Sequence, residues 1–203
     1  PGILKNGDEK IKYINDNFYN KFLSNFYVLT EKILKTFFLP SPRETFTLGL
    51  LGHDITRSRE YKNADIVHFH WLNQGFVRIS CLSKIDKPVV WTLRDMWAFT
   101  GGSHYDMDFE KYETTKISKF MQNYKKKHYG RDFNFITISD WLKIKAKDSF
   151  VLKKSRVDRI YNNIDLENFN PLSKDQGKKD LGINTQKQII LYGANNPQSK
   201  RKG

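Results

Sequence analysis

The fold is decided by one stretch of sequence, Pro88-Val-Val-Trp-Thr-Leu-Arg-Asp-Met-Trp-Ala-Phe-Thr-Gly-Gly-Ser-His-Tyr105. Its first part, Val89 to Leu93, is a short apolar run rich in β-branched and aromatic residues, which predicts a buried strand. Charged residues and paired glycines follow at once: Arg94, Asp95, Gly101, Gly102, Ser103 and His104. A buried strand that ends in this way is typical of a ligand site at the carboxyl edge of an α/β sheet. A glycine-rich turn with a surface ion pair has a similar composition, so both interpretations stay open.

Composition narrows the class of protein. The chain has 203 residues, with 35 Lys and Arg against 22 Asp and Glu, which gives a net charge of +13. This charge suits nucleic acid, anionic lipid or a phosphate-bearing ligand. Aromatic residues make up 14% of the chain, which excludes a disordered basic tail. Because no helix-turn-helix, zinc-finger or aromatic-sheet signature accompanies the charge, nucleic acid is the least favoured partner.

Cysteine content and hydropathy bear on location. The single Cys81 excludes an internal disulfide and a cysteine-based zinc site, which favours a reducing compartment such as the cytoplasm. No apolar run is long enough for a membrane span, and the N-terminus shows no signal-peptide core. The sequence also lacks an initiating Met, so we expect a fragment of a longer protein.

An amphipathic helix is predicted over Ile11 to Phe38, whole or broken in two. Its apolar residues recur mostly three and four apart: Ile11, Ile14, Phe18, Phe22, Phe26, Leu29, Ile33, Leu34 and Phe37. Pro40 and Pro42 end it. Lysines occupy its other faces, at Lys10, Lys12, Lys21, Lys32 and Lys35. We expect the apolar face to pack on the domain's own sheet. Peripheral contact with an anionic membrane is the alternative.

Strand and helix patterns alternate along the rest of the chain. Strands are predicted, the first only weakly, at Glu44–Leu51, Ile66–His70, Pro88–Leu93, Phe133–Ile138, Val157–Tyr161 and Gln188–Tyr192. Helices are predicted at Gln74–Ser83, at Thr114–Tyr129, after an N-cap at Ser139, and at Lys174–Leu181. The alternation predicts an α/β fold with a Rossmann-like parallel sheet and flanking helices.

Two polar clusters allow more than one interpretation. His68 and His70 share one strand face, where they would hold a metal, reach a polar ligand or make structural hydrogen bonds. No third metal ligand is spaced nearby, so no metal site is predicted. The basic run Lys125 to Tyr129, with Arg131, is interpreted first as a solvated helix end and second as a phosphate contact.

Five segments, taken in order, resemble glycosyltransferase family four, whose members have the GT-B fold, and the exopolysaccharide or colanic-acid type in particular. They are Ala64–Trp71, Pro88–Tyr105, Ile136–Leu142, Asn162–Pro171, and Ile189–Ala194 with Arg201-Lys202-Gly203. The similarity runs from about Phe46 to the end of the sequence.

The resemblance implies two Rossmann-like domains facing a cleft, the first binding acceptor and the second binding a nucleotide-sugar, with retaining transfer and no metal or cofactor. We therefore expect a helical segment at 1–45, an acceptor-side domain with the interdomain joint at 46–171, and the start of a truncated donor domain at 172–203. The fold is expected to be incomplete at both ends, and the missing donor domain is a necessary partner. This chain alone should not form a complete active cleft.

The resemblance also implies site residues. Arg94, Arg201 and Lys202 would contact the donor diphosphate. The cleft would be lined by His70, Asp95, Gly101, Gly102 and His104, and the interdomain joint would contain Asn163 and Asp165. The family commonly has His where this chain has Arg94. Arg binds phosphate, often bidentately, but cannot act as a neutral imidazole.

The implied activity is part of a glycosyl transfer from a nucleotide-sugar to a lipid-linked or polysaccharide acceptor at the cytoplasmic face of the inner membrane. A diverged, non-catalytic binding or scaffold module is the alternative. It is favoured by Arg94 and by the parts of the fold that are expected to be missing at both ends. A basic nucleic-acid binder ranks third.

Overall fold

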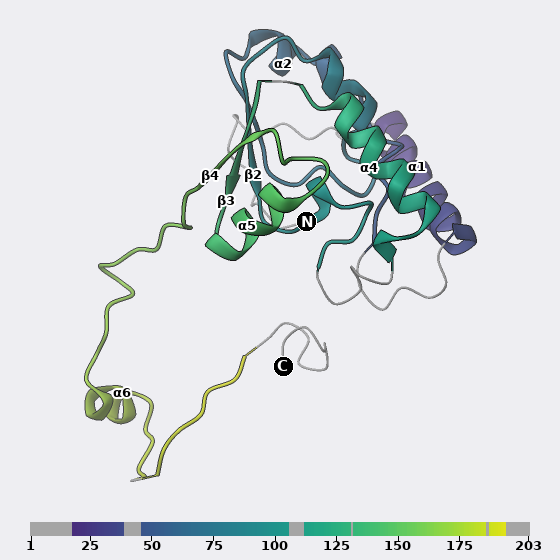
Figure 1. The fold of residues 1–203 in the computed structure, drawn as a ribbon. Helices are drawn as coiled ribbons and strands as arrows, with labels where there is room; N and C mark the ends of the chain where they lie inside the picture. The colour runs from purple at the N-terminus through teal and green to yellow at the C-terminus, as the bar shows by residue number, and fades with distance from the viewer. Residues whose placement is uncertain (1–17, 39–45, 106–111, 131, 186, 194–203) are drawn as a thin grey trace. The chain divides into compact units, whose positions relative to one another are not determined.

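The structure is a computed structural model that describes residues 18–38, 46–105, 112–130, 132–185 and 187–193. The centre of the fold is a sheet of four parallel strands in the order β1-β2-β3-β4 (Figure 1). The strands are β1 (Val67–Phe69), β2 (Val89–Leu93), β3 (Phe133–Thr137) and β4 (Arg156–Arg159). The predicted α/β fold with a Rossmann-like parallel sheet is confirmed.

The strands form where the apolar runs predicted them because their register aligns large side chains on one buried face. Phe69 lies opposite Trp91, Trp91 opposite Phe135, and Phe135 opposite Val157. All four are buried, and the Trp91 ring centroid lies 5.8 Å from that of Phe135. Successive side chains in a strand point to opposite faces, so this row forms one continuous apolar layer under the helices.

Helical segments connect the strands and precede the sheet. They are α1 (Phe18–Phe38), η1 (Ile55–Arg57), α2 (Arg59–Asn63), η2 (Ile79–Lys84), η3 (Trp97–Phe99), α4 (Lys116–His128), α5 (Asp140–Asp148) and α6 (Lys174–Asp180). Ser139 caps α5 as predicted, because its hydroxyl accepts the N–H of Leu142 at 3.2 Å. Thr115 caps α4 through the N–H of Ser118 in the same way.

Two elements predicted before Pro88 do not form. Glu44–Leu51 forms no strand over its described residues, and Phe46 makes only an isolated antiparallel bridge to Ser103. Gly49, at φ 71°, breaks the extended run. Gln74–Ser83 forms no α-helix, because Gln74 and Gly75 adopt φ 54° and 75°, in the left-handed region. The short helix η2 follows them instead.

The prediction for α1 is also wrong in orientation. Its inner face contacts the core through Leu34, and its Glu31 is buried. The apolar side chains predicted to pack on the sheet are 48% to 87% exposed: Phe18, Phe22, Phe26, Leu29, Ile33 and Phe37. Ile11 and Ile14 lie outside the described residues.

The chain divides into two units, residues 1–161 and 162–203. In the second unit α6 forms as predicted, but Gln188–Tyr192 forms no strand, and Ile190 and Leu191 are 94% and 95% exposed. A strand needs a neighbour for its backbone hydrogen bonds, and the described part of this unit contains no strand that supplies one. The boundaries predicted at 45/46 and 171/172 stay predictions.

Candidate functional site at the carboxyl ends of β1 and β2

The carboxyl ends of β1 and β2 meet at a small pocket. Trp91 ties the two ends together, because its indole Nε1–H donates to the carbonyl oxygen of His70 at 3.1 Å. The pocket is lined by His70, Trp71, Leu72, Asn73, Trp91, Leu93, Arg94, Asp95, Trp97 and Ala98. Three of the predicted site residues, His70, Arg94 and Asp95, therefore lie together at the edge where parallel sheets bind ligands.

The cationic part of the pocket is Arg94, whose side chain is exposed beside His70. The pKa of His70 is lowered, first by its loss of solvent, then by His68 and by the Arg94 charge. The two imidazole centroids lie 4.3 Å apart, and His68 Nε2 lies 2.9 Å from the Thr92 hydroxyl. His68 thus has the structural role that was one of the alternatives, whereas His70 faces the pocket.

Asp95 is held by a buried histidine. Its Oδ2 lies 2.7 Å from His104 Nδ1, and its Oδ1 accepts the backbone N–H of Trp97 at 3.0 Å. On the other side of the ring, His104 Nε2 lies 2.8 Å from the Thr47 hydroxyl. His104 is only 2% exposed, so it does not line the pocket surface as predicted. It orients the Asp95 carboxylate from below.

A buried lysine fixes the loop between β2 and α4. Lys125 Nζ donates to the carbonyl oxygens of Trp97 and Thr100, and lies 3.8 Å from the Trp97 ring centroid. Burial lowers the pKa of Lys125 to about 7, against the opposing pull of Asp95, Glu113 and Glu31. The prediction of a solvated face over this basic run is therefore wrong for Lys125, although Lys126 and Lys127 are exposed.

Gly101 and Gly102 serve packing in this structure and are buried. A Cβ on Gly101 would lie 1.7 Å from Ser118 Oγ, so glycine lets the loop touch α4. Gly102 has φ 145°, and a Cβ there would lie 2.5 Å from the Phe46 ring. The two glycines shape the loop that carries His104.

Asn73 is a pocket residue that the sequence analysis missed. It is 1% exposed, and its Oδ1 atom has no hydrogen-bond partner in the described structure. Buried polar atoms are normally paired, so an acceptor left open at a pocket wall suits a ligand hydroxyl or a water molecule. Its position three residues after His70, at the same sheet edge, was the available signal.

The remaining predicted site residues belong to the second unit of the chain. Asn163 and Asp165 belong to the second unit, where Asp165 accepts the N–H groups of Glu167 and Asn168. The Asn168 side-chain amide, followed by these backbone bonds, lowers the pKa of Asp165, which acts as a turn cap. Arg201 and Lys202 lie outside the described residues. A wider, open hollow in the second unit, beside Lys178 and Lys179, contains none of the predicted residues.

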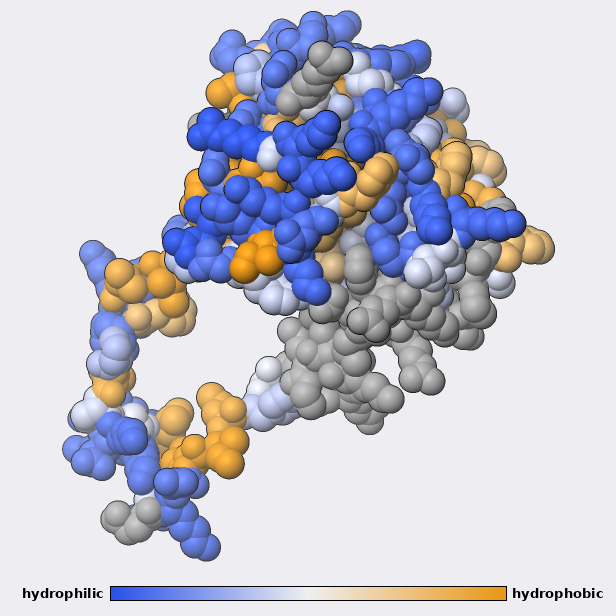
Figure 2. All heavy atoms as spheres, in the orientation of Figure 1, coloured by the Kyte–Doolittle hydropathy of each residue, from blue (hydrophilic) through white to orange (hydrophobic). Residues whose placement is uncertain are grey.

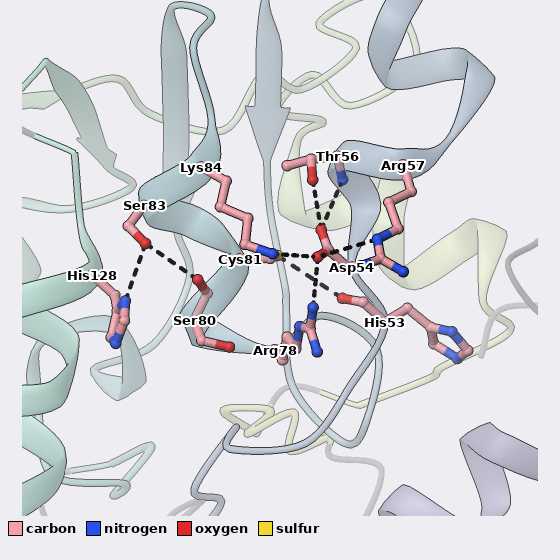
Figure 3. Close-up of polar contacts among 10 residues, drawn as sticks. All are labelled: His53, Asp54, Thr56, Arg57, Arg78, Ser80, Cys81, Ser83, Lys84 and His128. Atoms are coloured by element: carbon pink, nitrogen blue, oxygen red, sulfur yellow. Dashed lines mark hydrogen bonds and ion pairs between the residues drawn. The ribbon is translucent and has the colours of Figure 1, made fainter.

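A separate polar cluster surrounds Asp54 (Figure 3). Asp54 Oδ2 lies 2.6 Å from Arg78 Nη2 and 3.0 Å from Lys84 Nζ, and Oδ1 accepts from the Thr56 hydroxyl at 2.6 Å. Burial opposes ionisation, but these bonds outweigh it and hold the pKa of Asp54 well below its usual range. The cluster joins the loop before η1 to η2, and its one carboxylate is satisfied, so its role is structural.

Over residues 18–38, 46–105, 112–130, 132–185 and 187–193, no three His, Cys, Asp or Glu side chains are grouped to hold a metal ion. No helix in that part of the chain combines the length and apolarity that a membrane crossing needs.

The pocket combines an exposed guanidinium, a pre-oriented carboxylate and an open amide oxygen, groups that bind phosphate and sugar hydroxyls. The model of Glycosyltransferase Family 4 matches residues 19–168, which include the whole sheet and the pocket. The match begins upstream of Phe46 and so also includes nearly all of α1. Neither the curated proteins nor the solved structures gave a match. Because the family match spans most of its length, the chain belongs to glycosyltransferase family 4.

Proposed function

We propose that the chain is part of a retaining glycosyltransferase that moves a sugar from a nucleotide-sugar to a lipid-linked or polysaccharide acceptor in exopolysaccharide synthesis. One observation carries this proposal: Arg94, His70 and Asp95 converge on one pocket at the carboxyl ends of β1 and β2. A family 4 domain acts on glycosyl groups. The side chains of this pocket suit the diphosphate and the sugar hydroxyls of a nucleotide-sugar.

Arg94 contacts the diphosphate in this proposal. A leaving diphosphate accumulates negative charge as the glycosidic bond breaks, and a guanidinium placed beside it stabilises that charge. Arg201 and Lys202 would add positive charge from the donor side. No metal or cofactor is then required, since side chains neutralise the leaving group.

Asp95 and Asn73 orient sugar hydroxyls. Asp95 accepts a hydroxyl hydrogen while His104 holds its carboxylate in place at 2.7 Å. Asn73 Oδ1, which is open in the pocket wall, accepts a second one. His70, with its lowered pKa, is available as a neutral donor or acceptor near neutral pH. Asn163 and Asp165 would lie at the joint to a donor-binding domain, which completes the cleft.

The proposal places the protein in the cytoplasm, at the inner membrane face. Lipid-linked acceptors are held at that surface, and a chain of net charge +13 is attracted to its anionic lipids.

A thermal-shift titration with UDP, GDP and their sugars tests the proposed donor. A ligand that binds only the folded state raises the free energy of unfolding by RT ln(1 + [L]/Kd). We expect a saturable shift with one nucleotide class, lost in Arg94→Gln and retained in Arg59→Gln, a matched exposed arginine on α2. A shift that is equal in both variants would contradict the assignment of Arg94.

A non-catalytic binding or scaffold module is the second candidate, because Arg94 occupies the family's usual His position. The two candidates differ in turnover. Nucleotide binding without transfer, when the chain is combined with a donor-binding domain and acceptor, favours the binding module. Transfer with retained anomeric configuration favours the enzyme.

A further inference from the structure

The outer face of α1 carries an apolar surface that is exposed in the part of the chain that the structure describes. We name Phe18, Phe22, Phe26, Leu29, Ile33 and Phe37 the α1 stripe. Their spacings of four, four, three, four and four place them on one helix face, and each is between 48% and 87% exposed. At about 1.5 Å per residue the stripe is roughly 28 Å long. In Figure 2, hydrophobic side chains gather along the margin where α1 lies.

The inner face of α1 is already occupied, which fixes the direction of the stripe. The Glu31 carboxylate is buried and accepts the backbone N–H groups of Leu48 and Gly49. The Tyr27 ring packs edge-on against His53, with centroids 5.5 Å apart. Turning the stripe inward would break the Glu31 bonds and leave that carboxylate buried without a partner, which is costly. The stripe therefore faces away from the sheet.

The charges around the stripe favour an anionic occupant. Lys21 and Lys32 are exposed along one side of it, and Glu31, the one acidic residue of α1, is turned into the core. A second copy packed stripe to stripe would bring the two lysine rows together, and like charges repel. An anionic lipid surface instead pairs with the lysines while its acyl region receives the phenylalanines.

The shape of the stripe also suits a bilayer surface. Four of its six residues are phenylalanine, whose rings enter the boundary between headgroups and acyl chains. A helix with an apolar face on one side and polar or buried contacts on the other lies in the plane of the interface. The Glu31 bonds join α1 to the backbone at Leu48 and Gly49, within the first unit.

We propose that the α1 stripe docks on an anionic lipid bilayer, with the axis of α1 parallel to the membrane and the Phe side chains inserted. The stripe is separate from the pocket at β1 and β2. Vesicle binding and nucleotide binding are separate readouts, so failure of one leaves the other testable.

Vesicle flotation tests this docking with the full chain. We expect the protein to float with vesicles of phosphatidylcholine and phosphatidylglycerol, and to bind pure phosphatidylcholine far more weakly. Phe22→Ser/Phe26→Ser should weaken binding by at least about tenfold, because two apolar anchors are lost. Phe120→Ser, which removes a 53% exposed phenylalanine from α4, should leave binding unchanged.

A charge pair of variants tests the role of the lysines. Lys21→Gln/Lys32→Gln should weaken binding to the anionic vesicles by roughly thirtyfold at low salt, since each lysine near such a surface contributes about a factor of five. Lys119→Gln/Lys147→Gln removes the same charge from exposed positions on α4 and α5 and should have a much smaller effect.

Three results would overturn the proposal. They are no flotation with anionic vesicles, equal flotation of wild type and Phe22→Ser/Phe26→Ser, and a dimer in light scattering that depends on the same phenylalanines while vesicles have no effect. The last result would assign the stripe to a second copy. Because the stripe is exposed, the variants should unfold at the wild-type temperature, which excludes misfolding as the cause of lost binding.

Discussion

His104 Nδ1 lies 2.7 Å from Asp95 Oδ2, beneath the pocket where β1 and β2 end. The imidazole is 2% exposed and bridges the Asp95 carboxylate to the hydroxyl of Thr47. This bridge joins three separate parts of the chain around a side chain that faces the pocket. The orientation of the Asp95 side chain is therefore set by contacts within the fold, before any ligand binds.

Replacing His104 should therefore destabilise the protein. His104→Ala removes the partner of the Thr47 hydroxyl and of Asp95 Oδ2, while Asp95 Oδ1 keeps the N–H of Trp97. A buried polar group left unpaired costs about 1–3 kcal/mol. A loss of about 2 kcal/mol would lower the melting temperature by roughly 4–8 °C for a chain of this size. Differential scanning calorimetry measures it, with His70→Ala as the control, since that side chain is exposed. Equal melting of both variants would show that the bridge is not formed.

Gly101→Ala should destabilise the protein strongly. The new Cβ would meet Ser118 Oγ at 1.7 Å and Ser118 Cα at 2.4 Å, and the latter belongs to the backbone of α4 and cannot turn aside. We expect a loss of about 2 kcal/mol or more from overpacking, measured by urea denaturation. Gly177→Ala is the control, because α6 leaves nothing within 4 Å of its Cβ. It should cost nothing, and a helical alanine there should raise helicity slightly.

Asp54 should make stability fall in acid. Its pKa in the folded protein is held well below the usual value, so the unfolded chain binds the proton first as pH falls. The stabilisation is complete above a pH of about 4, the unfolded value, and is lost below it. We expect Asp54→Asn to cost about 1–2 kcal/mol at neutral pH. Melting curves from pH 7 to 3 should show the two proteins converging in acid, and a constant difference would contradict the ion cluster.

Lys125 should make the stability of the protein depend on pH in the alkaline range. Its pKa in the folded state is lowered to about 7, so between pH 7 and pH 10 the unfolded chain holds more protons. Stability should therefore rise with pH over that window, by up to about 4 kcal/mol, and this gain is lost as pH falls back to 7. The rise should be absent in Lys125→Met and present in Lys127→Met, where the lysine is exposed. Parallel slopes in all three proteins would refute a lowered Lys125 pKa.

The two central strands were predictable because each is a short, largely apolar run, whereas β4 (Arg156–Arg159) buries only Val157. Val89–Leu93 and Phe133–Thr137 appear within one residue of their expected bounds. The Ser139 cap was predictable because its chemistry is local. The convergence of His70, Arg94 and Asp95 followed from one rule, that parallel strands share a carboxyl edge.

The failures concern which side of an element faces the core. Periodicity identified the apolar stripe of α1, but it does not say what the stripe contacts, and here Glu31 turns the other face inward. Lys125 sits in a run of lysines, and only the tertiary fold places its ammonium beneath Trp97 and Thr100. The strand predicted at Gln188–Tyr192 does not form, because apolar composition alone cannot supply the neighbouring strand that its backbone hydrogen bonds need.

The central claim is that Arg94 holds the diphosphate of a nucleotide-sugar, and isothermal titration calorimetry of the nucleotide selected by thermal shift tests it most directly. A charge-assisted bond contributes about 1.5–3 kcal/mol, so the Kd should rise roughly tenfold to a hundredfold in Arg94→Gln. Arg94→Lys should fall between the two, because it keeps the charge and loses the bidentate geometry. The same Kd in wild type, Arg94→Gln and Arg59→Gln would contradict the account.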